Sequence, residues 1–174
     1  MSMSKVVVDA LNQQINNELG ASYEYLAMSG WCEGQTLQGA AKWLRLQSQE
    51  EYGHAMKLHD FVLARGGHVE LKALPAPTQS FKSLHDIFDK VLKQEQQVSQ
   101  QIDALYDLAF KEKAYAATVE LQWFLTEQVE EEKIGREIVA KFKLIGSDPA
   151  SILDKDRELG TRSAIAEPAT KAAL

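Results

Sequence analysis

The chain has 174 residues, of which 45% are hydrophobic and 25% are charged, and its formal net charge is −6. This length fits one domain with a substantial core, and the composition is not that of a disordered or fibrous protein. The negative charge argues against sequence-independent nucleic-acid binding, and no apolar run approaches the ~20 residues that would span a bilayer.

The N-terminal residues and the cysteine content bear on location. The first stretch, MSMSKVVVDALNQQ, lacks the apolar segment of a signal peptide. The single cysteine, Cys32, cannot form an internal disulfide, which suits a reducing compartment. We therefore expect a cytoplasmic protein that does not associate with membranes.

Long stretches free of proline are rich in Ala, Leu, Glu, Gln and Lys, which favour helices. They predict four long helices, at residues 5–33, 38–65, 82–111 and 115–145. The glycines that follow three of these stretches are typical of helix C-termini; they are Gly34, Gly66 with Gly67, and Gly146.

The C-terminal part is predicted to hold one short element and a tail. Asp148 and Pro149 are typical of the start of a helix, so a short fifth helix is expected there. The residues after Gly160 are small and polar. We therefore expect a domain at residues 1–160 followed by a flexible tail at 161–174.

The connection at residues 66–80 decides the topology. Short links make helices one and two antiparallel, and likewise helices three and four. A helix of ~28 residues is ~42 Å long, and ~15 extended residues can reach ~50 Å. The connection can therefore cross the whole bundle and make helices two and three parallel; the alternative is a mobile surface loop. Long loops without a role are uncommon in compact domains, which favours the crossover.

A glutamate interrupts the apolar stripe of every long helix near its middle. The stripes follow alternating steps of three and four residues, and the interrupting residues are Glu18, Glu51, Glu95 and Glu131. Central positions lie at one level whichever way the helices run. The four carboxylates should therefore converge, with His54 and Gln128 one turn away on the second and fourth stripes.

Each of these residues also has a simpler explanation. A single helical glutamate usually faces solvent, and a single histidine on an apolar stripe is more often a core residue than a ligand. Four buried carboxylates at one level would repel each other and be costly to desolvate. Protons could neutralise them, and two divalent cations would balance four negative charges. Oxygen-rich ligation with one imidazole suits iron or manganese, and the lack of thiolates argues against structural zinc.

Four stretches together carry a family resemblance: NNELGASYEYLAMSGWC, SQEEYGH, KQEQ and LQWFLTEQVEEEK. In this order and spacing, over about residues 5–160, the chain resembles the non-haem ferritins of bacteria and archaea. The resemblance implies an all-α, ferritin-like four-helix bundle with a long crossover and a short fifth helix. It also implies iron storage: Fe²⁺ is oxidised with O₂ or H₂O₂ and kept as ferric mineral inside a shell of twenty-four subunits.

The resemblance also implies roles for individual residues. Glu18, Glu51 and His54 match a first iron site. Glu51 would bridge to a second iron, and that site would be completed by Glu95 and Glu131 with Gln128 close by.

Further residues match positions near this pair. Glu50, Glu127 and Glu130 match a third, neighbouring iron site; the alternative is a solvated run of charge. Tyr25 matches a tyrosine beside the centre, where it is expected to donate a hydrogen bond or to supply an electron.

One sequence difference on the fourth helix distinguishes this chain from two related subfamilies. Bacterioferritins and rubrerythrins carry a second Glu-x-x-His on the fourth helix, whereas this chain has Gln128-Val-Glu-Glu131. The single cysteine also argues against a rubredoxin module. Met28 and Met56 are expected to be core methionines, so no haem is predicted.

Two rival functions stay open at this point. A di-iron oxidase or peroxidase of the ferritin-like superfamily would act on another substrate and needs a pocket beside the metals. A purely structural helical bundle would bind no iron, but it has no reason to interrupt four apolar stripes at one level.

Overall fold

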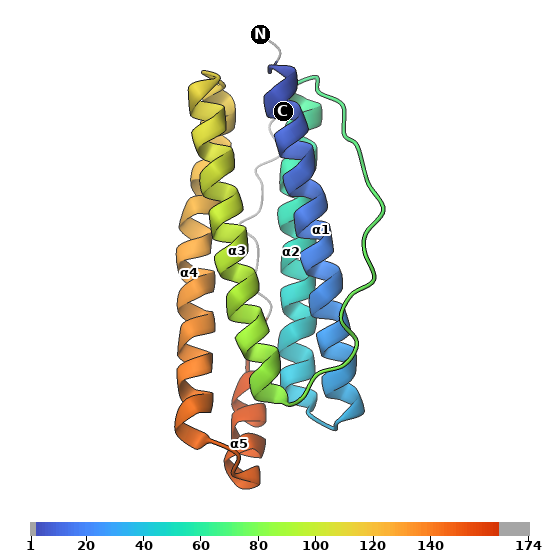
Figure 1. The fold of residues 1–174 in the computed structure, drawn as a ribbon, viewed down its shortest axis with the longest axis vertical. Coiled ribbons are helices and arrows are strands. Elements are labelled where there is room, and N and C mark those ends of the chain that lie inside the picture. Colours follow the sequence, from blue (N-terminus) through green and yellow to red (C-terminus); the bar gives the residue numbers. More distant parts are fainter. Residues whose placement is uncertain (1–2, 164–174) are drawn as a thin grey trace.

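The computed structural model describes residues 3–163, and in this range it contains five helices and no strand (Figure 1). The helices are α1 (Lys5–Gly34), α2 (Gln38–Ala64), α3 (Leu84–Lys111), α4 (Tyr115–Ile145) and α5 (Pro149–Gly160). The predicted all-α fold is confirmed, and each long helix begins and ends within two residues of its predicted bounds. Residues 164–174, most of the predicted tail, lie outside the described residues.

The crossover between α2 and α3 runs the length of the bundle, so that α2 and α3 point in the same direction (Figure 1). Two buried asparagines of α1 form hydrogen bonds with the backbone of this crossover. Asn12 donates to the His68 carbonyl at 2.8 Å and accepts from the Glu70 amide at 2.8 Å. Asn16 accepts from the Lys72 amide at 2.7 Å. These bonds fix the path of the connection, which excludes the alternative of a free surface loop.

Local sequence signals account for several helix ends. The Ser83 side chain accepts from the Asp86 amide at 3.1 Å and caps α3, and Asp148 caps α5 in the same way. Gly146 after α4 has a φ of 60°, which glycine adopts without strain. The end of α1 differs from the expectation: the residue with positive φ is Thr36, at 61°, rather than a glycine.

The apolar core consists of two clusters, one at each end of the bundle. The end near α5 contains rings such as Trp43, Phe88 and Phe142. The opposite end is mostly aliphatic, with Leu11, Ile15, Leu58, Ile102 and Leu121 among its members. The four predicted glutamates belong to neither cluster and lie near the mid-length of the long helices, whereas Tyr25 belongs to the cluster at the α5 end.

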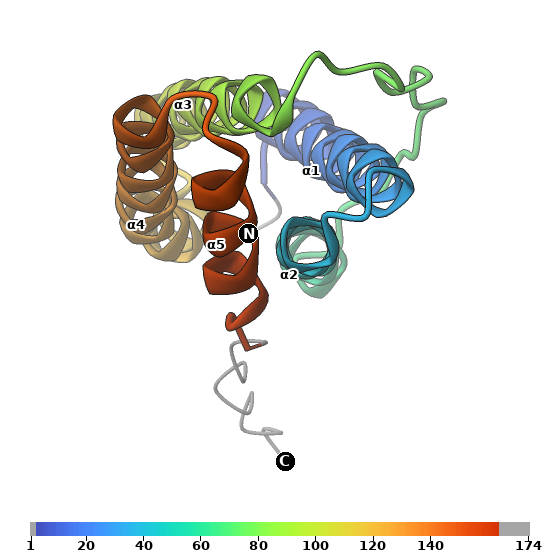
Figure 2. The same ribbon diagram turned by 90° about the horizontal axis from the view of Figure 1, so that it is seen from below.

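The short helix α5 lies across one end of the bundle, between α2 and α4 (Figure 2). Asp156 accepts from the amides of Gly39 and Ala40, at 3.2 and 2.7 Å, and so caps the start of α2. A Cβ on Gly39 would lie 1.8 Å from the Asp156 carbonyl oxygen, so the contact requires glycine. This docking places the residues that follow α5 alongside α2.

None of the helices in the described part of the chain combines the length and apolar character needed to cross a bilayer.

Candidate metal centre

The structure buries all four predicted glutamates in the middle of the bundle. Each comes from a different long helix, and their exposed fractions are 0% for Glu18, 1% for Glu51, 1% for Glu95 and 4% for Glu131. The apolar neighbours above and below each glutamate on its stripe turn that stripe inward. Because each glutamate continues the stripe, it must follow its neighbours into the interior.

One half of the centre has the geometry of a metal site. Ligand atoms of Glu18, Glu51 and His54 all lie within 4.8 Å of one another, and all three residues are buried. The Nδ1 atom of His54 is 3.2 Å from Glu51 Oε2. Two carboxylates and an imidazole from adjacent helices can thus converge on one cation.

The other half is organised around Glu95 and Glu131. The Tyr25 hydroxyl donates to Glu95 Oε1, and Gln128 Nε2 donates to Glu95 Oε2 at 3.3 Å and to the Glu95 carbonyl at 3.1 Å. Gln47 Nε2 donates to Glu131 Oε2 at 3.0 Å. Amides and a phenol therefore hold these two carboxylates in place.

Burial governs the ionisation of this layer. Loss of hydration raises the pKa of Glu18 and of Glu51 well above the usual value, and the negative charges of neighbouring glutamates add to the effect. Burial, with repulsion from Glu95, raises the pKa of Glu131 to about 8. Burial also raises the pKa of Glu95, although the Tyr25 and Gln128 hydrogen bonds act against it. The centre favours protons or cations over bare carboxylates.

A buried oxygen without a hydrogen-bond partner shows where a cation fits. Glu18 Oε1 accepts from Gln14 at 2.8 Å, but Glu18 Oε2 is buried and has no partner. An unsatisfied buried carboxylate oxygen is costly, and this one belongs to the Glu18, Glu51 and His54 group. Hard oxygen donors with one imidazole fit iron or manganese, so the donor set fits the predicted iron.

A second group adjoins the first through His54. Ligand atoms of Glu50, His54 and Glu127 lie within 4.8 Å of one another, with Glu50 and Glu127 partly exposed. Glu130, the remaining residue of the predicted third site, is exposed and is not part of this group. It lies one helical turn from Glu127 but further round the helix toward solvent, so its role stays a prediction.

Three polar residues at the centre were not singled out from the sequence. Gln14 binds Glu18, Gln47 binds Glu131, and Arg162 donates to both Gln47 and Glu50. The spacing of four residues between Gln14 and Glu18 was an available signal. Arg162 offered none, because only the docking of α5 brings it to α2.

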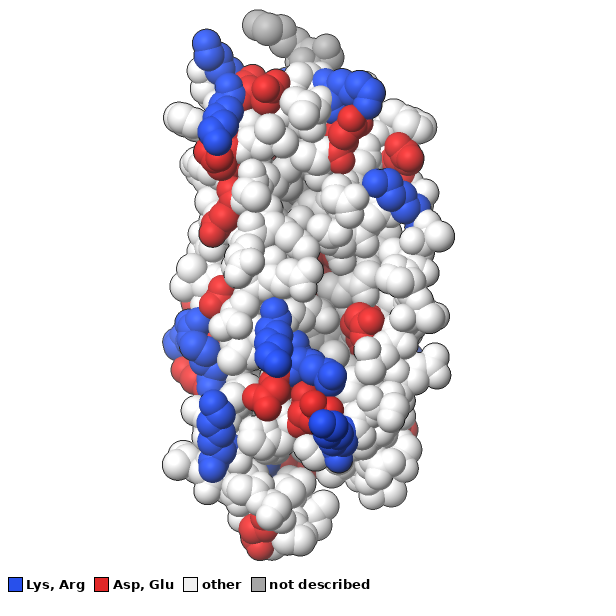
Figure 3. Space-filling model, viewed as in Figure 1, with Lys and Arg blue, Asp and Glu red and all other residues white. Residues whose placement is uncertain are grey.

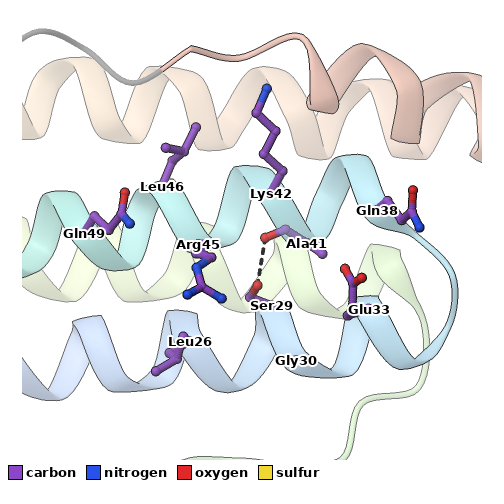
Figure 4. A pocket seen from close by; sticks show the side chains of 10 residues that line it. All are labelled: Leu26, Ser29, Gly30, Glu33, Gln38, Ala41, Lys42, Arg45, Leu46 and Gln49. Atoms are coloured by element: carbon purple, nitrogen blue, oxygen red, sulfur yellow. Dashed lines mark hydrogen bonds between the residues drawn. The ribbon is translucent and has the colours of Figure 1, made fainter.

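A hollow on the outside of the bundle is separate from this centre. Its volume is about 670 Å³, and it lies between α1 and α2 with Leu26, Glu33, Lys42 and Arg45 among its lining residues (Figure 4). None of the side chains in the two metal-binding groups lines it. It therefore does not provide the pocket beside the metals that the rival oxidase requires.

Known proteins share this fold and sequence pattern. Residues 8–145 match the family described as Ferritin-like domain. The chain is 38% identical over 161 residues to the bacterial non-haem ferritin of Staphylococcus haemolyticus, covering 92% of this chain and 97% of the relative. It is 43% identical over 144 residues to that of Campylobacter jejuni, covering 83% and 86%.

A solved structure agrees with these relatives. The crystal structure of an open-pore ferritin from the archaeon Archaeoglobus fulgidus superposes with a TM-score of 0.92 at 42% identity, covering 94% of this chain and all of that one. The agreement covers a larger share of the chain than the family match, which ends at residue 145. Family, sequence relatives and fold coincide: the chain belongs to the ferritin family, among its non-haem members.

Proposed function

We propose that this chain is the subunit of an iron-storage ferritin that oxidises Fe²⁺ at a di-iron centre within each bundle and stores Fe³⁺ as mineral. The observation that carries the proposal is the layer of four buried glutamates, one of them with an oxygen that has no partner. Two divalent ions would neutralise the four carboxylates and so offset the cost of burying them at one level.

The proposed ligands divide between two ions. Glu18, Glu51 and His54 hold the first Fe²⁺, and Glu51 bridges to a second, which is held with Glu95 and Glu131 while Gln128 lies close by. Anionic oxygen ligands stabilise Fe³⁺ more than Fe²⁺, so the site favours loss of an electron from each ion. The two electrons reduce O₂, with two protons, to H₂O₂; alternatively they reduce H₂O₂, with two protons, to two waters.

Proton release accompanies iron binding in this scheme. The raised pKa values of Glu18, Glu51 and Glu131 mean that protons compete with metal ions for these carboxyls. Metal ions bind the deprotonated groups, so binding displaces protons. The Tyr25 hydroxyl is buried and donates to Glu95; we assign it the role of orienting that carboxylate, close enough also to supply an electron.

The storage role requires a shell, for which we propose twenty-four subunits in the cytoplasm. Exposed apolar side chains on α1 and the crossover support a subunit contact: Tyr23 is 44% exposed, Leu26 45% and Leu71 63%. Figure 3 shows that acidic and basic side chains are mixed near both ends of one face, with a mostly uncharged band between. Such a face suits packing against another subunit better than binding to nucleic acid.

The test is aerobic Fe²⁺ oxidation, followed by ferric absorbance in the assembled apo-protein. The double variant Glu51→Ala, His54→Ala should oxidise iron at least about tenfold more slowly, because both ions lose a ligand. His59→Ala, Asp60→Ala is the matched control, since it removes a partly exposed histidine and an exposed acid from α2, away from the proposed ligands. Equal rates for the parent and the Glu51, His54 variant would exclude the centre, and a monomer or dimer in sedimentation analysis would exclude the shell.

A further inference from the structure

Arg162, two residues beyond the end of α5, is bound to the side of α2. Its Nη1 donates to Gln47 Oε1 and its Nη2 donates to Glu50 Oε2, both at 2.6 Å. The guanidinium carbon lies 4.6 Å from the centre of the Trp43 ring. Only 16% of the side chain is exposed. Two hydrogen bonds and a stacked ring hold the charge in one place.

Glu50 therefore has two competing uses. It is one of the ligands in the Glu50, His54 and Glu127 group, yet one of its oxygens already accepts a charge-assisted bond from Arg162. An Fe²⁺ ion in that group would share Glu50 with a guanidinium, and two positive charges at such short range repel strongly. Either the ion binds weakly or Arg162 must release Glu50.

We propose that Arg162 is a resident cation that competes with iron for Glu50 and keeps the third site weak. Iron then binds tightly only at the pair formed by the four buried glutamates and passes through the Glu50 site without remaining there. This inference rests on the proposed function, because it concerns the route of the same iron ions. A residue just after α5 would thereby control the affinity of a metal site on α2.

The contacts of Arg162 predict which metal site a substitution at this residue should affect most. Arg162 binds Glu50 directly, whereas its hydrogen-bond route to the buried pair runs through Gln47, whose Nε2 donates to Glu131 at 3.0 Å. Its charge also acts on Glu131 through space, where it opposes the rise in the pKa of that carboxyl. A change at residue 162 should therefore alter the third site more than the pair. The fold should survive, because Asp156 and the close approach of Gly39 hold α5 independently.

The experiment is calorimetric titration of assembled apo-protein with Zn²⁺, which binds carboxylate and imidazole ligands but is not oxidised. We expect two tight ions and one weak ion per subunit in the parent. In Arg162→Gln the third ion should bind at least roughly tenfold more tightly, while the first two change less. Arg162→Lys should give an intermediate value, because it keeps the charge but not the two-pronged geometry.

Two controls isolate the mechanism. Lys141→Gln also removes a positive charge that binds α5, through Glu158 at 2.7 Å, and should leave the third ion unchanged. Glu50→Gln combined with Arg162→Gln should abolish the gain. The proposal is overturned if Arg162→Gln leaves third-ion affinity unchanged or lowers it, or if neither protein binds a third ion. A parent protein that binds no tight pair would overturn the proposed function itself, and this inference with it.

Discussion

The two ends of the bundle are apolar, whereas its middle layer contains buried carboxylates. At the α5 end, the rings of Phe88 and Phe142 stack with centroids 5.4 Å apart inside an apolar cluster, and the opposite end is filled with aliphatic side chains. Between them lie buried glutamates whose pKa values are raised. The ends supply the free energy of folding, whereas the metal-free middle opposes it. The apolar clusters at both ends offset the unfavourable middle layer.

The largest expected effect comes from weakening one end. Phe88 is fully buried, so Phe88→Ala should lower the free energy of unfolding by about 3–5 kcal/mol through the lost contacts and the cavity left behind. Denaturant unfolding of the metal-free protein measures it. Phe110→Ala, at a 61% exposed position of the same helix, should change it by less than about 0.5 kcal/mol. Similar losses for both variants would contradict the inference that the buried rings at the α5 end stabilise the fold.

A substitution in the middle layer is expected to have a smaller effect and to raise, rather than lower, the stability of the metal-free protein. The pKa of Glu131 rises from 4.5 to about 8 on burial. Between these values the folded protein binds more protons than the unfolded chain, so the stability of the metal-free protein should fall as pH increases from about 4.5 to about 8. Glu131→Gln keeps the shape and cannot ionise. At pH 8 it should raise the apparent Tm by about 2–8 °C, the shift that about 1–2 kcal/mol produces at this chain length.

The same measurement made across pH sharpens the comparison. The parent Tm should decline between pH 5 and pH 8 more steeply than that of Glu131→Gln, and saturating Zn²⁺ should reverse the order of the two proteins. If Glu131→Gln instead destabilises the metal-free protein at pH 8, ionisation of the buried carboxylates does not lower its stability.

The smallest effect is expected at Tyr25. Its hydroxyl donates to Glu95, and Tyr25→Phe leaves the ring in place. We expect a loss of about 0.5–1.5 kcal/mol in the free energy of unfolding of the metal-free protein, with both tight Zn²⁺ ions still bound. Loss of one of those ions would mean that Tyr25 positions Glu95 for metal binding to a greater degree than a single hydrogen bond suggests.

The elements were predictable because the signals are local. Helix-forming composition and capping residues such as Ser83 and Asp148 act within one or two turns of the chain. Glu18, Glu51, Glu95 and Glu131 were identified because each interrupts a periodic apolar stripe, and periodicity fixes which way a side chain faces. The turn at Thr36 differs from the prediction, because a helix-ending position with positive φ, followed here by a bond from the Leu37 amide to the Cys32 carbonyl at 3.0 Å, is usually glycine.

The sequence alone determined the four long helices and the depth at which four carboxylates meet, because helical periodicity constrains both, and the length of the connection favoured a crossover. The bonds from Asn12 and Asn16 then excluded a free loop. Only the tertiary structure decided which polar partners surround them. Gln47 reaches Glu131 on another helix, and Arg162 reaches Glu50 across more than a hundred residues of chain. The first contact depends on how α2 lies relative to α4 and the second on how α5 docks against α2, and no local pattern in the chain encodes the angle at which two helices meet.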